Sequence, residues 1–369
     1  MQPASYDKNL LKNLKDKNEI YRQMITPLKN GRQKVLEDGE LTMWGNTMKF
    51  CYRKIGSKPQ RGFPLIFGLH GGGGCDASEN DKQWDNHKQL YDLEDCIWFT
   101  PRSPEDAWNM WHKFYIDDMI DYIIQSFLIL EWIDPNRVFI SGYSAGGYGV
   151  YKISPRMSDR FAGCAMMPGH PNGADITSVR NTFFSLQVGK YDSPYNRNTI
   201  CAEYGEKLKT LQKKDPDGYD HFVLIHEDCE HLMNLKDKIV FDIFKFKVIN
   251  YLPKYVIWKQ CNDVQKTNFY WLEIPKQKLK AGAQVIGKIE NNFITITSDD
   301  YDEVIINLND SLVNFNEVIS VRFNNSEVFK NSYFENIDTV IASIERKFDP
   351  YLIFGVRFSV SKSGVNLLG

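Results

Sequence analysis

The chain has 369 residues, 42% of them hydrophobic, which is enough for two domains that each bury a core. Lys and Arg total 45 against 47 Asp and Glu, a net charge of −2, which excludes a basic nucleic-acid-binding surface and an acidic disordered tail.

No apolar stretch approaches the ~20 residues that a membrane helix needs, and the N-terminus lacks the apolar core of a secretory signal. The seven cysteines are odd in number and scattered, which is typical of reduced thiols. We therefore expect a cytoplasmic protein without a membrane or nucleic-acid partner. No group of side chains has metal-ligand spacing, so we expect neither a metal nor a cofactor.

The first 45 residues are charged and helix-prone, and we expect residues 1–45 to form a helical lead-in that packs on the main domain. Strand and helix patterns alternate over residues 46–254. The expected strands are 47–55, 63–70, 96–102, 136–141, 160–169, 181–189 and 221–226. The expected helices are 79–95, 114–133, 148–154, 201–214 and a closing helix at 231–252. This alternation predicts an α/β domain with a mostly parallel sheet covered by helices on both faces.

The pattern changes after Pro253. Residues 255–369 contain short alternating strand patterns separated by turn residues, and one helical pattern at 337–348. Such spacing predicts a smaller, mainly β accessory domain with a sandwich-like or small barrel architecture.

Residues 142–147 read GYSAGG, with Ser144 between glycines. An apolar strand pattern precedes them, and a helix pattern follows and is expected to end before Pro155. A strand that turns directly into a helix needs small residues around the turn, and the middle side chain becomes exposed. This is the nucleophile-elbow pattern, and it makes Ser144 the candidate nucleophile.

A second glycine-rich segment, FGLHGGGG at 67–74, ends another buried strand pattern. Glycines let the backbone approach a substrate and direct N–H groups at a developing oxyanion. We expect the donors to be the N–H of Ala145 and that of Gly72 or Gly73. A phosphate-binding loop is excluded because no Gly-Lys-Ser/Thr follows.

A hydrolytic serine also needs an acid and a histidine that follow later strands of the sheet. Asp192 follows the strand pattern that ends at 189 and is the expected acid, ahead of Asp217 and Asp220 in a polar loop. His231 lies in the loop after the last strand and is the expected base. His226 ends that strand and is the alternative, or a hydrogen-bonded core histidine.

The segments LHGGGG, DPNRVFISGYSAGG, PRMSDRFAG, QVGKYDSPYNRN and IHEDCEHLMN resemble serine α/β-hydrolases near the polyhydroxybutyrate depolymerases, feruloyl and acetyl esterases and dienelactone hydrolases. The resemblance covers residues 46–252 and implies a Ser144–His231–Asp192 triad. Many relatives carry an aromatic residue where this chain has Leu232. The dienelactone branch uses a cysteine nucleophile, which disfavours its chemistry here. Residues after 254 look like the C-terminal β domain of some of these hydrolases.

The expected activity is hydrolysis of small-molecule or carbohydrate-linked carboxylic esters through an acyl-enzyme. A serine peptidase or amidase, and a non-catalytic binding scaffold on the same fold, are the alternatives. Assembly into a homo-oligomer through the β domain is also open. Residues expected near the pocket are His70, Trp108, Trp111, His112, Tyr143 and His170, although aromatic packing under a helix explains the tryptophans equally well.

Overall fold

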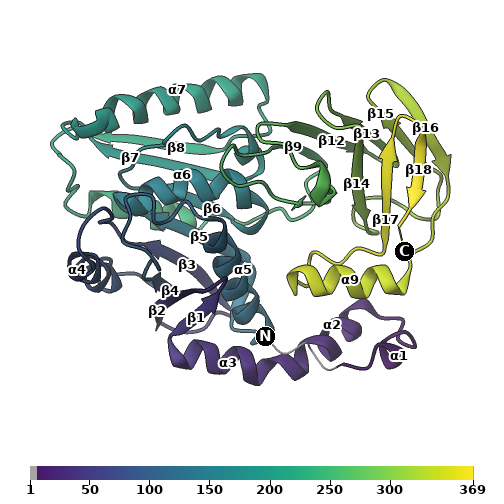
Figure 1. Cartoon of the computed structure of the whole chain (residues 1–369), viewed down its shortest axis with the longest axis horizontal. Helices are drawn as coiled ribbons and strands as arrows, with labels where there is room; N and C mark the ends of the chain where they lie inside the picture. Colours follow the sequence, from purple (N-terminus) through teal and green to yellow (C-terminus); the bar gives the residue numbers. More distant parts are fainter. Residues whose placement is uncertain (1–5, 369) are drawn as a thin grey trace. The chain divides into compact units, whose positions relative to one another are not determined.

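Figure 1 shows the computed structural model, which describes residues 6–368. The described chain forms two compact units that are both discontinuous in sequence. The α/β unit comprises Val35–Ile124 and Glu131–Asn250. The β unit comprises the described residues up to Lys34, Gln125–Leu130, and those from Tyr251 onward.

An eight-stranded sheet forms the centre of the α/β unit, with the strand order β1-β2-β4-β3-β5-β6-β7-β8 (Figure 1). The strands are β1 (Glu40–Met43), β2 (Asn46–Ile55), β3 (Phe63–Leu69), β4 (Cys96–Pro101), β5 (Ile133–Gly142), β6 (Gly163–Met166), β7 (Phe183–Gly189) and β8 (His221–His226). β2 pairs with β1 and β4 in antiparallel fashion, and the pairs from β4 through to β8 are parallel. The expected mostly parallel sheet is confirmed.

Helices cover both faces of this sheet. They are α4 (Ala77–Lys88), α5 (Phe114–Ile129), α6 (Ala145–Met157), α7 (Arg197–Lys214) and α8 (Ile239–Phe244). A Cβ on Gly68 of β3 would lie 3.0 Å from Nε2 of His87 in α4, whereas a Cβ on Gly149 of α6 would lie 3.2 Å from the side chain of Leu69. Because successive strand residues point to opposite faces, α4 and α6 lie on opposite sides of β3.

Two helices differ from the sequence prediction. Pro155 does not end α6 but lies within its last turn, so the helix lacks the N–H bond that this position would donate, and the surrounding side chains are buried. The expected closing helix at 231–252 is reduced to α8, preceded by a 3₁₀ turn at Lys236–Lys238. Asn234 and Leu235 take left-handed φ values of 51° and 61°, which no continuous α-helix accepts.

The β unit contains two five-stranded sheets, ordered β10-β11-β14-β17-β18 and β16-β15-β13-β12-β9. The strands are β9 (Tyr255–Lys259), β10 (Asn268–Phe269), β11 (Leu272–Glu273), β12 (Gln284–Glu290), β13 (Phe293–Thr297), β14 (Glu303–Leu308), β15 (Ile319–Phe323), β16 (Ser326–Asn331), β17 (Val356–Ser361) and β18 (Gly364–Leu367). The ring of Trp258 stacks on Phe269 across the sheets at 5.7 Å, and Phe329 meets Phe358 at 6.3 Å. The expected sandwich-like architecture is confirmed.

Three helical segments at the N-terminus precede the sheet: α1 (Lys8–Leu11), α2 (Lys17–Ile25) and α3 (Lys29–Asp38). The buried face of α2 packs with α9 (Ile337–Lys347), and the hydroxyl of Tyr21 donates to the carbonyl oxygen of Phe348 at 3.0 Å. The buried residues of this cluster are Leu11, Ile20, Tyr21, Met24, Ile25, Ile129, Val340, Ile341, Ile344, Phe348 and Ile353. Residues 6–34 of the expected lead-in belong to the β unit, their cluster includes Ile129 of α5 from the expected main domain, and β1 already begins inside residues 1–45. Within residues 6–368, no helix is both long and apolar enough to cross a bilayer.

Candidate active site

The candidate residues follow four strands whose carboxyl ends lie at the same edge of the sheet. The glycine-rich loop follows β3, Ser144 follows β5, Asp192 follows β7 and His231 follows β8. In open α/β sheets this edge is where ligands bind, because the loops that leave neighbouring parallel strands converge there.

Ser144 occupies a sharp turn between β5 and α6. Its backbone lies at φ 57° and ψ −117°, and its N–H donates to the carbonyl oxygen of Pro168 at 2.8 Å. The turn requires glycine next to it, since a Cβ on Gly146 would lie 2.0 Å from the carbonyl oxygen of Leu69. This geometry is that of a nucleophile elbow, with the hydroxyl directed away from the sheet at the N-terminus of α6.

A chain of hydrogen bonds links the three expected residues. Nε2 of His231 lies 2.9 Å from Oγ of Ser144, and Nδ1 of His231 lies 2.8 Å from Oδ2 of Asp192. Asp192 is buried, whereas His231 is partly exposed. The structure thus brings Ser144, His231 and Asp192 together in the order that a base-activated serine requires.

The charge of Asp192 fixes the tautomer of the histidine. Burial acts to raise the pKa of Asp192, but hydrogen bonds from His231 and Arg197 outweigh it and hold this pKa below its ordinary value. The carboxylate is therefore ionised near neutral pH and can only accept hydrogen bonds. Nδ1 of His231 carries the proton that binds Asp192, which leaves Nε2 free to accept the proton of Ser144.

The expected oxyanion loop is held open by a buried asparagine. Oδ1 of Asn80, in α4, accepts from the N–H of Gly73 at 2.7 Å, and its Nδ2 donates to Asp106 at 2.9 Å. Gly72 lies at φ +96°, a conformation that favours glycine. In the part of the chain that the structure describes, the N–H groups of Gly72 and Ala145 have no hydrogen-bond partner. The N–H of Gly73 already donates to Asn80. Of the two glycine donors that the sequence left open, the structure therefore favours Gly72.

A cavity of about 380 Å³ contains the pair Ser144 and His231. It is lined by Gly72, Gly73, Trp108, Ser144, Ala145, Tyr148, His170, Asn172, Tyr195, Arg197 and His231. Trp108 and Tyr195 are 55% and 75% exposed, so two exposed aromatic rings line the cavity together with polar side chains.

Four residues expected at the pocket do not line this cavity. His70 is buried beneath the glycine-rich loop, with Nδ1 2.6 Å from the carbonyl oxygen of Gly71, and burial lowers its pKa to about 4. Trp111 is buried and donates to the carbonyl oxygen of His70, and His112 is buried against the ring of Trp108. Tyr143 lies beside the histidine loop, and its hydroxyl donates to the carbonyl oxygen of His231 at 2.6 Å.

The structure also separates the alternatives for the acid and base. His226 is buried, and its Nε2 lies 3.0 Å from Oε1 of Gln187, as expected of a hydrogen-bonded core histidine. Asp217 and Asp220 are exposed, and Asp220 pairs with Lys247. Among the described residues, no group of three or more acidic, histidine or cysteine side chains could hold a metal ion.

Several residues at the site were missed by the sequence analysis: Asn80, Tyr148, Asn172, Tyr195 and Arg197. Tyr148 and Arg197 carried a weak signal, since each lies within five residues of an expected triad member. Asn80 carried none, because an asparagine in a polar helix is ordinarily a solvated residue.

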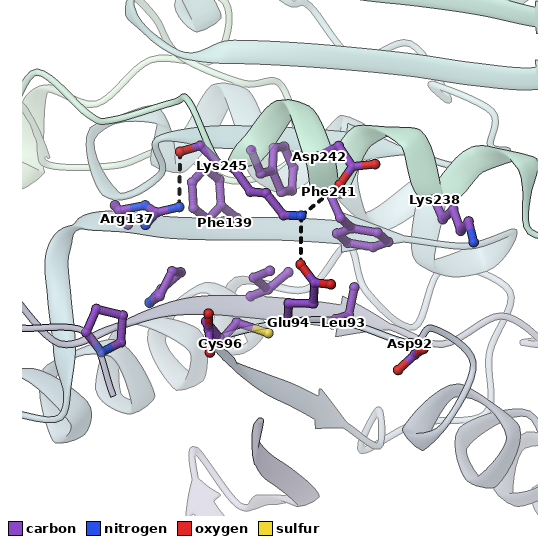
Figure 2. Close-up of a pocket in the computed structure, with 15 residues that line it drawn as sticks. Asp92, Leu93, Glu94, Cys96, Arg137, Phe139, Lys238, Phe241, Asp242 and Lys245 are labelled. Atoms are coloured by element: carbon purple, nitrogen blue, oxygen red, sulfur yellow. Dashed lines mark hydrogen bonds and ion pairs between the residues drawn. The ribbon is translucent and has the colours of Figure 1, made fainter. Parts of the chain in front are cut away.

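A second cavity of about 510 Å³ lies at the other end of the sheet, near the amino ends of β3 and β4 (Figure 2). Its lining includes Phe139, Phe241 and the buried thiol of Cys96. Lys245 crosses it and pairs with Glu94 at 3.1 Å and Asp242 at 2.9 Å. Although this cavity is larger, its lining holds no serine or histidine, so the nucleophile–base pair lies in the smaller one.

The mostly parallel sheet, its antiparallel β2 and the strand–turn–helix elbow after β5 define the α/β-hydrolase fold. The structure is similar to the BES protein from Bacillus cereus (12% identity, TM-score 0.42, covering 56% of this chain and 92% of that chain). It is also similar to an acetyl xylan esterase from Aspergillus awamori (11% identity, TM-score 0.40, covering 56% of this chain and 98% of that chain). A third similar structure is a poly(3-hydroxybutyrate) depolymerase from Bordetella parapertussis (11% identity, TM-score 0.40, covering 54% of this chain and 84% of that chain). No protein-family model and no curated protein matches the sequence. At these identities and TM-scores, the fold class rests on the strand order and elbow of this chain itself.

Proposed function

We propose that the protein is a serine hydrolase that cleaves carboxylic esters through an acyl-enzyme, with Ser144, His231 and Asp192 as its triad. The observation that carries this proposal is the bonded chain from Ser144 Oγ through His231 to Asp192, at 2.9 and 2.8 Å, beside two unpaired backbone N–H groups. Four separate loops contribute to it, which is hard to reconcile with an idle serine in a turn.

In the first half of the reaction, Oγ of Ser144 attacks the ester carbonyl carbon while Nε2 of His231 takes the hydroxyl proton. The carbonyl oxygen becomes negatively charged and accepts hydrogen bonds from the N–H groups of Ala145 and Gly72. The N-terminus of α6 adds a partial positive charge at the same place. Asp192 stabilises the imidazolium, which then donates its proton to the leaving alkoxide as the C–O bond breaks.

In the second half, water replaces the alcohol. His231 takes a proton from this water as it attacks the acyl carbon, and the same N–H groups receive the second oxyanion. Collapse releases the carboxylic acid and returns the proton to Ser144. Neither half requires a metal or a redox cofactor, since each proton leaves and returns through His231.

We further propose that the substrate is a small-molecule or carbohydrate-linked ester. The exposed rings of Trp108 and Tyr195 support a group that stacks, as a sugar or aromatic ring does. The polar side chains of Tyr148, His170 and Asn172, which also line the cavity, support a group that carries hydroxyls.

A cytoplasmic location and self-association through the β unit remain proposals. Among the described residues no disulfide joins any two cysteines, which supports a reducing compartment. Edge strands such as β16 and β18 could pair with a second copy of the chain. Sedimentation of the full chain at several concentrations tests the second proposal, and a concentration-independent monomer would contradict it.

A fluorophosphonate probe and a panel of aryl esters from acetate to octanoate test the proposed activity. The full chain should be labelled at Ser144 and should hydrolyse at least one of the esters, and Ser144→Ala should lose both properties. The exposed Ser193→Ala, beside Asp192, is the matched control and should keep both. A protein that is neither labelled nor active would be a scaffold, and cleavage of anilide substrates in preference to esters would make it an amidase.

A further inference from the structure

Arg197 contacts the triad acid and also lines the cavity. Its Nε lies 3.0 and 2.9 Å from the two carboxylate oxygens of Asp192, and a terminal nitrogen lies 2.7 Å from Oδ1. The other terminal nitrogen donates to the hydroxyl of Tyr148 at 3.1 Å. The guanidinium therefore binds the loop after β7 and the first turns of α6 together, and both side chains of the ion pair are buried.

The backbone takes an unusual path to make this contact. Tyr195 lies at φ 58° and ψ 18°, and Asn196 at φ 56° and ψ 30°, so two successive L-residues adopt the left-handed conformation. Such residues are disfavoured and persist where surrounding contacts hold them, often at functional sites. Here they reverse the chain so that Arg197, at the start of α7, returns to Asp192.

Arg197 and His231 compete for the same carboxylate. Oδ2 of Asp192 accepts from Nδ1 of His231 at 2.8 Å and from Nε of Arg197 at 2.9 Å. A fixed cation beside the carboxylate weakens its attraction for an imidazolium, and the same cation repels the imidazolium directly. Both effects favour the neutral histidine, which is the form that accepts the proton of Ser144.

We propose that Arg197 is a positioning residue that holds the Asp192 carboxylate and, by sharing it with His231, sets the pH at which Ser144 becomes reactive. This inference rests on the triad of the proposed function. It goes beyond that function because it makes the midpoint of the acid limb of the pH profile depend on a residue outside the triad.

The other titratable groups around the pair do not supply this cation. Tyr143 and Ser144 contact His231 from the elbow, Tyr148 and His170 line the same cavity, and Cys201 lies near Asp192 from α7. Burial raises the pKa of Tyr143 and raises that of Cys201 to about 12, so both stay neutral at neutral pH.

The rate at which a fluorophosphonate labels Ser144, measured from pH 5 to 9 on the full chain, tests the proposal without knowledge of the substrate. In Arg197→Met the plateau rate should fall by about 10²-fold, because Asp192 loses its fixed position. The midpoint of the acid limb should rise by about one pH unit, because the competing cation is gone. Arg197→Lys keeps the positive charge but cannot contact the carboxylate through two nitrogens. Its plateau labelling rate should therefore fall, while the midpoint of its acid limb stays near that of the wild type.

Lys209→Met is the matched control, since it removes an exposed cation from the same helix and leaves the ion pair of Arg197 with Asp192 intact; its plateau and midpoint should match the wild type. An Arg197→Met protein that has the wild-type plateau and midpoint, with only a lower Tm, would show a purely structural role and overturn the proposal. If Arg197→Met does not fold, a wild-type plateau in Arg197→Lys overturns it instead. An unlabelled wild type would contradict the proposed function itself, which is a separate result.

Discussion

Asp192 has three donors around its carboxylate, and only one of them is the histidine. Asp192→Asn keeps the size of the side chain but places an N–H₂ group where an acceptor is needed. His231 is then held in the wrong tautomer, and Arg197 loses its ionic partner. We expect kcat for an aryl ester to fall by roughly 10⁴-fold.

The exposed Asp217→Asn is the control for Asp192→Asn and should retain wild-type kcat. Steady-state kinetics with a chromogenic ester compares the two variants. A large loss of kcat in Asp217→Asn together with an active Asp192→Asn would show that the acid is Asp217 and not Asp192.

The grouping of Ser144, His231 and Asp192 could be predicted from sequence because each of them follows a recognisable strand. Ser144, Asp192 and His231 stand just beyond the ends of β5, β7 and β8, and parallel strands end at one edge. Arg197 could not be predicted, because its contact depends on two left-handed residues that leave no clear signal in the sequence. His70 was misplaced for the converse reason: it follows a strand, but its ring turns inward to Ser103, whose N–H donates to it at 3.2 Å.

At the scale of elements, α4 supports the loop that would bind the oxyanion. Its buried Asn80 holds the N–H of Gly73, and a Cβ on Gly72 would lie 2.3 Å from the same side-chain oxygen. Asn80→Ala removes this support, so the loop can move and Gly72 no longer aims its N–H. We expect kcat for an aryl ester to fall by on the order of 10²-fold, with a smaller change in KM.

Asn86→Ala, an exposed asparagine on the same helix, is the matched control and should leave kcat unchanged. Equal kcat in wild type and Asn80→Ala would mean that the loop keeps its shape without α4. A rise in KM alone would show that Asn80 acts on substrate binding and not on the oxyanion.

Two buried histidines, His87 in α4 and His70 after β3, make the free energy of unfolding depend on pH. Burial lowers the pKa of His87 to about 3 and that of His70 to about 4, against about 6.5 for an exposed histidine. Between these values the unfolded chain binds protons that the folded chain does not, so acidification favours unfolding. Each pKa unit corresponds to about 1.4 kcal/mol, so the free energy of unfolding should fall by several kcal/mol from pH 6.5 to pH 4.

Denaturant titrations at a series of pH values measure this slope. His87→Leu removes one titrating group from the contact with Trp98, so its curve should be shallower than that of the wild type below pH 6.5. Parallel curves would mean that His87 does not titrate on unfolding. The stability of the variant at pH 7 is not diagnostic, because only the difference in slope reports proton uptake.

Strands were easier to predict than helices in this chain. β3, β4 and β7 are buried along their whole length and are visible as continuous apolar runs. The length of the helix at 231–252 was overestimated because the apolar spacing of this segment is helical. The left-handed turn at Asn234 and Leu235 contains no proline or glycine that would indicate a break.

At the scale of the whole molecule, the N-terminal helices contribute to the stability of the β unit. Met24 is fully buried among residues of α2 and α9. Met24→Ala should destabilise the β unit by about 2–5 kcal/mol, as expected for a large core side chain reduced to alanine. The rate at which a fluorophosphonate labels Ser144 should not change, because the triad lies in the other unit.

Thermal unfolding measured by calorimetry, together with the labelling rate, separates these two effects. The exposed Lys15→Ala is the control in the same segment and should change neither quantity. A Met24→Ala protein with wild-type stability would show that the segment contributes no core, and a lost labelling rate would show that the units do not function independently.

The change in strand pattern predicts a division near residue 254, but no pattern in the sequence predicts that both compact units are discontinuous. The apolar pattern of an amphipathic helix such as α2 indicates that one face is buried, but it does not identify the element that packs against that face. The partner here, α9, lies more than 300 residues later in the chain, as the hydrogen bond from Tyr21 to Phe348 shows.

The central claim is that Ser144 carries the acyl group of the substrate. Rapid acid quenching of the protein with a p-nitrophenyl ester, followed by peptide mass spectrometry, measures this directly. The account predicts an acyl adduct on the peptide that contains Ser144, formed in a burst of nitrophenol and absent from Ser144→Ala. Hydrolysis of the ester without a covalent adduct on that peptide, or an adduct on Cys75 or another residue that persists in Ser144→Ala, would contradict it.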